Sequence, residues 1–142
     1  IIISDARLQE LYDQVCSVGG VGEVLFCEMI ITTNEFKRFT DPKKFACYAG
    51  IAPFEHSSGS SIRGRSRISR MGNKTTKRTL HLAAMSAVAM RGELQDFYKR
   101  KVGEGKNKMS VLNAVRNKII HRVFACVREK RKYDKSYTHA LA

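Results

Sequence analysis

The 142-residue sequence is long enough for one domain with a buried core and too short for two. An apolar fraction of 43% excludes a wholly disordered chain, and a net charge of +13 favours nucleic acid as the partner. No apolar run reaches the length of a transmembrane helix and no segment resembles a signal peptide, which makes a membrane partner the weaker interpretation.

Hydrophobic periodicity and capping residues predict three helices in the first third of the chain. The first spans 4–15, and the second follows a glycine-rich turn at 18–22 and ends near 33. The third starts with Pro42, a residue favoured in the first helical position, and stops at Gly50. The candidate N-caps of the first and third helices are Ser4, Asp5, Thr40 and Asp41.

The middle of the chain is different, because 53–73 lacks helical periodicity and is rich in serine, glycine and arginine. We predict an irregular basic loop there. Asn73 then caps a helix at 74–90 that has a narrow face of small residues, and a shorter helix follows at 92–102. The small-residue face consists of Leu80, Ala83, Ala84, Ala87 and Val88.

A long amphipathic helix closes the domain, with an apolar face from Val111 to Val127 and basic residues over much of the rest, Arg116 among them. We expect the tail from 130 onward to fray. The predicted fold is mainly α, one domain over 1–142. Its parts are a helix-hairpin-helix-like element at 5–33, the loop at 53–73 and a helical part at 74–131.

The turn at 18–22 has the form Gly-hydrophobic-Gly between two helices, which is typical of a helix-hairpin-helix. Such a turn exposes backbone N–H groups, here at Gly20 and Gly22, which can bind a DNA phosphate without reading bases. A plain turn in which glycine only satisfies the backbone geometry fits equally well. Phe26 stands where the usual pattern has a small residue, which favours a different packing of the second helix.

Positive charge converges on the start of the helix at 74. Lys74, Lys77 and Arg78 oppose the helix dipole there, which is unfavourable unless an anion is bound. No acidic residue lies between Glu55 and Glu93 to balance them, so we favour phosphate binding over an ordinary solvated surface. The preceding loop adds candidate phosphate-binding residues: Arg63, Arg65, Arg67 and Arg70.

The same loop carries a candidate nucleophile, Ser58, because Gly59 permits close approach of a substrate. A serine needs a base and a group that stabilises developing charge. His56 is a candidate base and the arginines are candidate stabilisers, although a mobile loop without chemistry has the same composition. The cysteines and histidines lack metal-site spacing, so we expect buried thiols, and no cofactor or metal in this chain.

Several motifs occur together and in order: the Gly-hydrophobic-Gly turn, YAGIAP from 48, SSG from 57, and a spaced arginine, Gly-Asn and Ala-Ala pattern from 67. The stretch 18–90 resembles the C-terminal domain of insertion-sequence-110-family transposases, also described as the IS116/IS110/IS902 type. Gly19 stands where that family usually has proline.

The resemblance implies a DNA transposase whose serine attacks a phosphodiester and becomes covalently linked to the DNA. The family serine precedes the glycine of its Ser-Gly step, which is Ser58 here. Less favoured alternatives are Ser57, Ser60 and Ser61.

The resemblance also implies partners and a location. They are an N-terminal domain with a Holliday-junction-resolvase-like fold, whose acidic residues bind a divalent metal, and a guide (bridge) RNA. We expect this chain to be part of a longer polypeptide, to be inactive in isolation, and to form homo-oligomers. Its expected location is the bacterial cytoplasm, in association with the nucleoid.

Two alternatives remain at this point. One is a basic helical module that binds nucleic acid while the chemistry happens elsewhere. The other is an oligomerisation domain that pairs through its last helix. A binding module tolerates loss of the Ser58 hydroxyl, whereas loss of an arginine weakens its binding and flattens the salt dependence.

Overall fold

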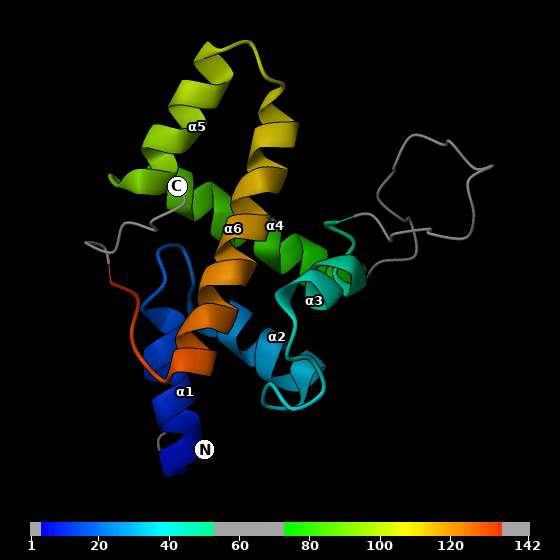
Figure 1. Ribbon diagram of the computed structural model, residues 1–142, viewed down its shortest axis with the longest axis vertical. Helices are drawn as coiled ribbons and strands as arrows, with labels where there is room; N and C mark the ends of the chain where they lie inside the picture. The colour runs from blue at the N-terminus through cyan, green and yellow to red at the C-terminus, as the bar shows by residue number, and fades with distance from the viewer. Residues whose placement is uncertain (1–3, 53–72, 135–142) are drawn as a thin grey trace, which may run out of the picture.

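The computed structural model describes residues 4–52 and 73–134, which form an all-helical arrangement without strands (Figure 1). The mainly α prediction is confirmed. No helix in these ranges is both long and apolar enough to cross a bilayer. The helices are α1 (Ala6–Cys16), α2 (Glu23–Thr33), α3 (Pro42–Tyr48), α4 (Lys74–Ala89), α5 (Glu93–Gly103) and α6 (Lys108–Glu129).

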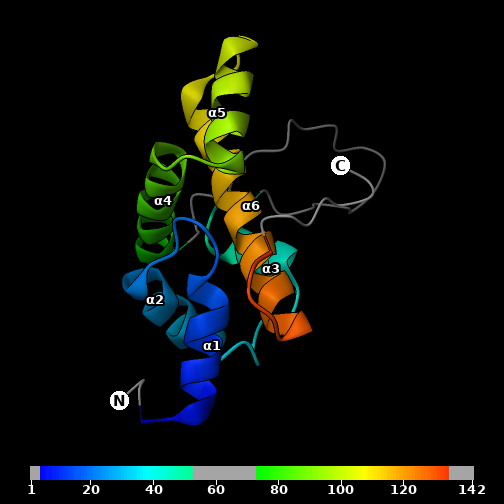
Figure 2. The same cartoon turned by 90° about the vertical axis from the view of Figure 1, so that its left-hand side faces the viewer.

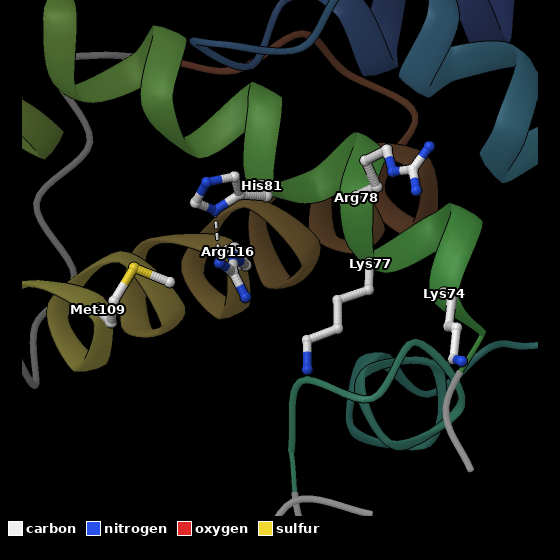
Figure 3. A pocket seen from close by; sticks show the side chains of 6 residues that line it. All are labelled: Lys74, Lys77, Arg78, His81, Met109 and Arg116. Atoms are coloured by element: carbon white, nitrogen blue, oxygen red, sulfur yellow. Dashed lines mark hydrogen bonds between the residues drawn. The ribbon is translucent and has the colours of Figure 1, made fainter. Parts of the chain in front are cut away.

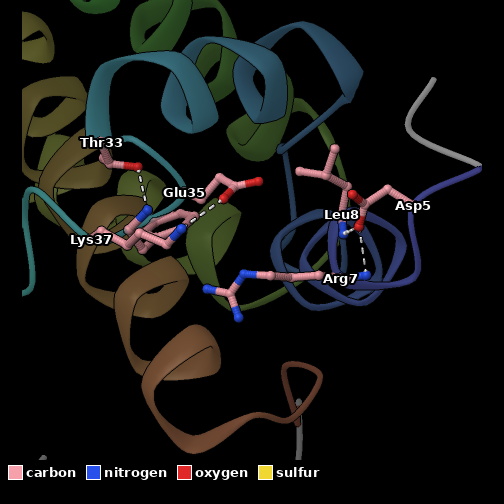
Figure 4. Close-up of polar contacts among 7 residues, drawn as sticks. Asp5, Arg7, Leu8, Thr33, Glu35 and Lys37 are labelled. Carbon is pink, nitrogen blue, oxygen red and sulfur yellow. Dashed lines mark hydrogen bonds and ion pairs between the residues drawn. The ribbon is translucent and has the colours of Figure 1, made fainter.

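The helix starts follow the predicted caps. Asp5 caps α1 by accepting hydrogen bonds from the backbone N–H groups of Arg7 and Leu8, at 2.9 and 3.1 Å (Figure 4). Asp41 caps α3, with Pro42 in its first turn. In both places the aspartate, rather than the neighbouring serine or threonine, supplies the cap.

The long helix α6 is the centre of the fold, and α1, α3, α4 and α5 all pack against it (Figures 1 and 2). Its buried face includes Leu112, Val115, Ile119 and Ile120. Arg116 lies on this face too and is 5% exposed, so its predicted place on the polar side is wrong. Position 116 is four residues from both Leu112 and Ile120, and helical geometry therefore puts all three on one side.

The turn between α1 and α2 packs tightly against α4. Gly20 has a φ of +89°, and a Cβ atom there would lie 2.5 Å from the carbonyl oxygen of Ala83 and 2.7 Å from the Cβ of Ala87. Only glycine fits this close approach. The small-residue face of α4 is therefore confirmed as a packing surface, and the turn lies across it.

The chain leaves α2 through three consecutive left-handed residues, Asn34, Glu35 and Phe36, with φ of 49°, 56° and 63°. Thr33 holds this turn, because its hydroxyl accepts the N–H of Phe36 at 2.9 Å and donates to the carbonyl of Met29. The turn buries the Phe36 ring edge-on against Phe124 of α6. Ring burial offsets the backbone strain of residues that rarely adopt this conformation.

The tail after α6 is bound to the domain as far as the structure describes it. The backbone N–H of Tyr133 donates to the Ser17 hydroxyl at 2.7 Å, and the Tyr133 hydroxyl donates to the Glu93 carboxylate at 3.2 Å. The Tyr133 ring also lies 4.9 Å from the guanidinium of Arg122. The prediction that the chain frays from 130 onward is therefore wrong for this part of the tail.

Candidate nucleic-acid interface

An open cavity of about 280 Å³ lies between the first half of α4 and the first half of α6 (Figure 3). Four of its lining side chains come from α4 and two from α6. All but one of the six carry nitrogen donors, and none is acidic. The lining consists of Lys74, Lys77, Arg78, His81, Met109 and Arg116.

The start of α4 is positively charged, and Glu28 of α2 is the described carboxylate that meets it, by accepting from the Thr76 hydroxyl at 2.8 Å. The first turn of α4 contains no acidic residue, and Asn73 caps it with a neutral amide that accepts the N–H groups of Thr75 and Thr76. Lys74 and Arg78 are exposed, Lys77 is half-buried, and none of these three forms an ion pair with a described residue. A helix N-terminus of this kind attracts anions.

Arg116 projects into the cavity from α6. Its Nη2 group donates to Nδ1 of His81, and its Nη1 group donates to Oδ1 of Asn113 at 3.4 Å. A nitrogen that accepts from a guanidinium carries no proton, so the proton of the neutral His81 ring is on Nε2. Burial, then the charge of Arg116, lowers the pKa of His81. Burial also lowers the pKa of Arg116.

The described residues on both sides of the 53–72 segment are held beside this cavity. The backbone N–H of Asn73 donates to the carbonyl of Tyr48, and its side-chain amide donates to the Tyr48 hydroxyl, each at 2.9 Å. On the other flank, the Asn113 amide donates to the carbonyl of Ile51 at 2.9 Å. The described residues that flank the segment with the predicted nucleophile, Ile51 and Asn73, therefore lie next to the basic cavity.

The structure brings together three of the predicted site residues, Lys74, Lys77 and Arg78. Gly20 and Gly22 lie in the α1–α2 turn and do not line the cavity. Gly20 is explained by packing, whereas Gly22 is exposed, with nothing within 4 Å of a Cβ atom placed on it. The remaining predicted residues lie outside the described ranges: Ser58, Arg63, Arg65, Arg67 and Arg70.

His81, Asn113 and Arg116 were missed as site residues by sequence reasoning. Arg116 offered a usable signal, because it interrupts an otherwise apolar series spaced three and four residues apart on α6. A charged residue at such a position is either paired or functional. His81 offered no comparable signal, because it contacts Arg116 only when α4 packs against α6 in the tertiary fold.

A model of the family described as Transposase IS116/IS110/IS902 matches residues 12–99. The chain belongs to this transposase family. The matched range contains every site residue predicted from the sequence, whereas Arg116 and Asn113 lie beyond it. The family model thus covers the α4 side of the cavity and leaves its α6 side outside the match.

Curated relatives extend the similarity over most of the chain. The pilin gene-inverting proteins of Moraxella lacunata and Moraxella bovis are each 30% identical over 122 residues, 85% of this chain and 38% of theirs. An insertion element IS110 protein of 43.6 kDa from Streptomyces coelicolor is 30% identical over 118 residues, 83% of this chain and 29% of its own. The chain thus spans little more than a third of these relatives at most.

Proposed function

We propose that this chain is the DNA-binding and serine-bearing part of a transposase or related DNA recombinase. Membership of the transposase family supports a role in moving or inverting DNA. The observation that carries the proposal is the basic start of α4, where Lys74, Lys77 and Arg78 form no ion pair with a described residue. The described flanks of the Ser58 segment are held beside it. The described flanks of the segment that carries Ser58 thus adjoin a surface suited to DNA phosphates.

The proposed chemistry is a transesterification. The Ser58 oxygen forms a bond to a DNA phosphorus, and the bond from that phosphorus to one deoxyribose oxygen breaks. The serine proton passes to a base, and the departing hydroxyl of the cut strand takes up a proton. Reversal of the same step with a different DNA hydroxyl rejoins strands without an external energy source, because the phosphoserine bond conserves the phosphodiester.

The divalent metal implied by the family does not fit the residues that the structure describes. No group of three His, Cys, Asp or Glu side chains in these ranges is placed to hold a metal ion. We therefore derive no step through a metal here, and propose that the N-terminal domain of the full-length protein supplies it. Guide RNA and a second copy of the chain are also proposed partners, because the family resemblance implies them.

The alternative function is a nucleic-acid-binding module without a nucleophile. The same basic cavity supports it, because Lys74, Lys77 and Arg78 grip a phosphate whether or not Ser58 reacts. The two functions differ in one respect only. A recombinase of the proposed type forms a covalent protein–DNA intermediate, and a binding module does not.

The test uses the full-length protein with its RNA and labelled donor and target DNA. We expect a protein–DNA adduct on a denaturing gel, lost in Ser58→Ala and kept in the controls Ser57→Ala, Ser60→Ala and Ser61→Ala. DNA binding by Ser58→Ala should stay at the wild-type level. An adduct that persists in Ser58→Ala assigns the attack to another residue. Recombination by wild type without any adduct supports the binding module.

A further inference from the structure

Arg116 is a buried cation without an anionic partner in the described part of the chain. It is 5% exposed, it forms no ion pair with a described residue, and its Nε atom is buried without a hydrogen-bond partner. A buried charge is strongly disfavoured unless an opposite charge lies close to it. Within the described residues, therefore, no carboxylate balances the charge of Arg116, and an anion would satisfy it.

The groups that hold Arg116 fix its position and leave its charge in place. His81 and Asn113 both act as neutral acceptors for the guanidinium. Carboxylates at these positions would orient the side chain equally well, but they would also cancel its charge. The lowered pKa of His81 keeps its ring neutral near pH 7, which preserves this arrangement.

The cavity around Arg116 suits a phosphate group in charge, donors and size. Lys74 and Lys77 stand along α4 on the same cavity, and the α4 N-terminus lies at its edge (Figure 3). Arginine forms directional hydrogen bonds to phosphate oxygens, and lysine adds positive charge without a fixed geometry. The volume of about 280 Å³ leaves room for a group larger than one water.

We infer that this cavity binds one phosphate group of the DNA backbone, with Arg116 as its central donor and Lys74 and Lys77 at its rim. The inference rests on the proposed function, which is the reason for naming DNA as the source of the phosphate. It adds a contact from α6, outside the range of the family match. Asn113 bonds both Arg116 and the Ile51 carbonyl, so the phosphate is held next to the start of the Ser58 segment.

The first test compares two arginines of α6 in the full-length protein. Arg116→Met and Arg122→Met remove the same charge, but Arg122 already has a carboxylate partner, Glu93 at 2.9 Å. With a labelled DNA duplex, we expect Arg116→Met to bind about 10- to 100-fold more weakly, the size of a charge-assisted hydrogen bond. Its plot of log affinity against log salt should be shallower by about 0.9. Arg122→Met should bind normally.

Stability separates a ligand site from a structural role. Without DNA, Arg116→Met should unfold at the same temperature as wild type or higher, because it removes an unpaired buried charge. Wild-type binding by Arg116→Met overturns the inference. A lower unfolding temperature in proportion to the loss of binding also overturns it, since Arg116 would then act through the fold.

A second pair of variants tests the neutral acceptor. His81→Glu places a carboxylate beside Arg116 and should weaken duplex binding at least 10-fold without lowering the unfolding temperature. His81→Gln keeps a neutral acceptor and should bind within about twofold of wild type. Equal binding by the two variants contradicts the inference, because the free charge of Arg116 would then be unimportant.

The outcomes also separate this inference from the proposed function. Weak binding by Arg116→Met together with an adduct that survives Ser58→Ala leaves the phosphate site standing and removes the role of Ser58. Normal binding by Arg116→Met with an adduct lost in Ser58→Ala does the reverse. If Arg116→Met weakens binding of the guide RNA but not of the duplex, DNA is the wrong ligand and the inference fails.

Discussion

The first two turns of α4 carry Lys74, Lys77 and Arg78 toward an open cavity, whereas its later turns bury Ala83, Ala84 and Ala87. The first half of α4 thus carries basic side chains beside the open cavity, whereas its second half packs against the backbone of the α1–α2 turn. The packed half allows almost no change, because the α1–α2 turn lies directly on it. The position of the charged half is fixed by the Asn73 cap and by its hydrogen bond to Tyr48, and neither contact uses the basic side chains.

The difference teaches that a glycine-rich turn and a basic helix start have separate roles in this domain, although both suggested phosphate binding. Gly20 faces α4 and serves packing, and the turn does not line the cavity. Glu23 in the first turn of α2 also places negative charge at the helix start that follows the turn. Phosphate binding is therefore better supported at α4 than at α2.

The largest expected effect is in the packed half. Gly20→Ala should lower the free energy of unfolding by about 3 kcal/mol, because the new Cβ clashes with α4 and its backbone is left-handed. Gly22→Ala is the matched control, with open space around its Cβ, and should cost less than about 1 kcal/mol. Denaturant unfolding measures both, and equal losses would contradict the packing role of Gly20.

A smaller effect is expected where the charged half begins. Asn73→Ala removes the α4 cap and the hydrogen bond from the side-chain amide to the Tyr48 hydroxyl. We expect it to lower the free energy of unfolding by about 2 kcal/mol. Asn107→Ala removes only the cap of α6, so its loss should be about 1 kcal/mol. Chemical denaturation of both variants tests this order. A loss in Asn73→Ala no larger than in Asn107→Ala would show that the tie to Tyr48 adds nothing.

The smallest effect is a pH dependence. The pKa of His81 is lowered in the folded state, so the unfolded chain binds more protons as the pH falls through the usual histidine range. Stability should therefore decline between pH 7 and pH 5. The decline should be smaller in His81→Gln, in which one of the titrating histidines is gone. Identical declines would contradict a lowered pKa of His81 in the folded state, whether burial or the charge of Arg116 is its cause.

Much of the fold was predictable because its signals are local. Asp41 with Pro42 specifies the start of α3, and Asn73 specifies the start of α4, through contacts within a few residues. The close-packed face of α4 could likewise be predicted from its alanines. In contrast, the left-handed turn at 34–36 contains no glycine, and burial of Phe36 against α6 stabilises it. Sequence patterns do not report such tertiary compensation.

The candidate site was predictable in part for the same reason. Lys74, Lys77 and Arg78 share one helix start, so their convergence follows from spacing in the sequence. His81 and Arg116 are 35 residues apart and meet only because α4 crosses α6. Arg116 was placed on the polar side because its charge outweighed its position in the apolar series.

The most direct measurement of whether the charged half of α4 is the DNA-binding face is a pair of triple variants in the full-length protein. One changes Lys74, Lys77 and Arg78 to Gln, and the other changes the exposed Lys99, Arg100 and Lys106 to Gln. The charge loss is identical, so only location differs. The α4 variant should reduce the slope of log affinity against log salt by about 2 to 3, and the control should leave it within about 0.5 of wild type. Equal changes in both variants would show that DNA senses only the net charge, and would contradict a binding face at α4.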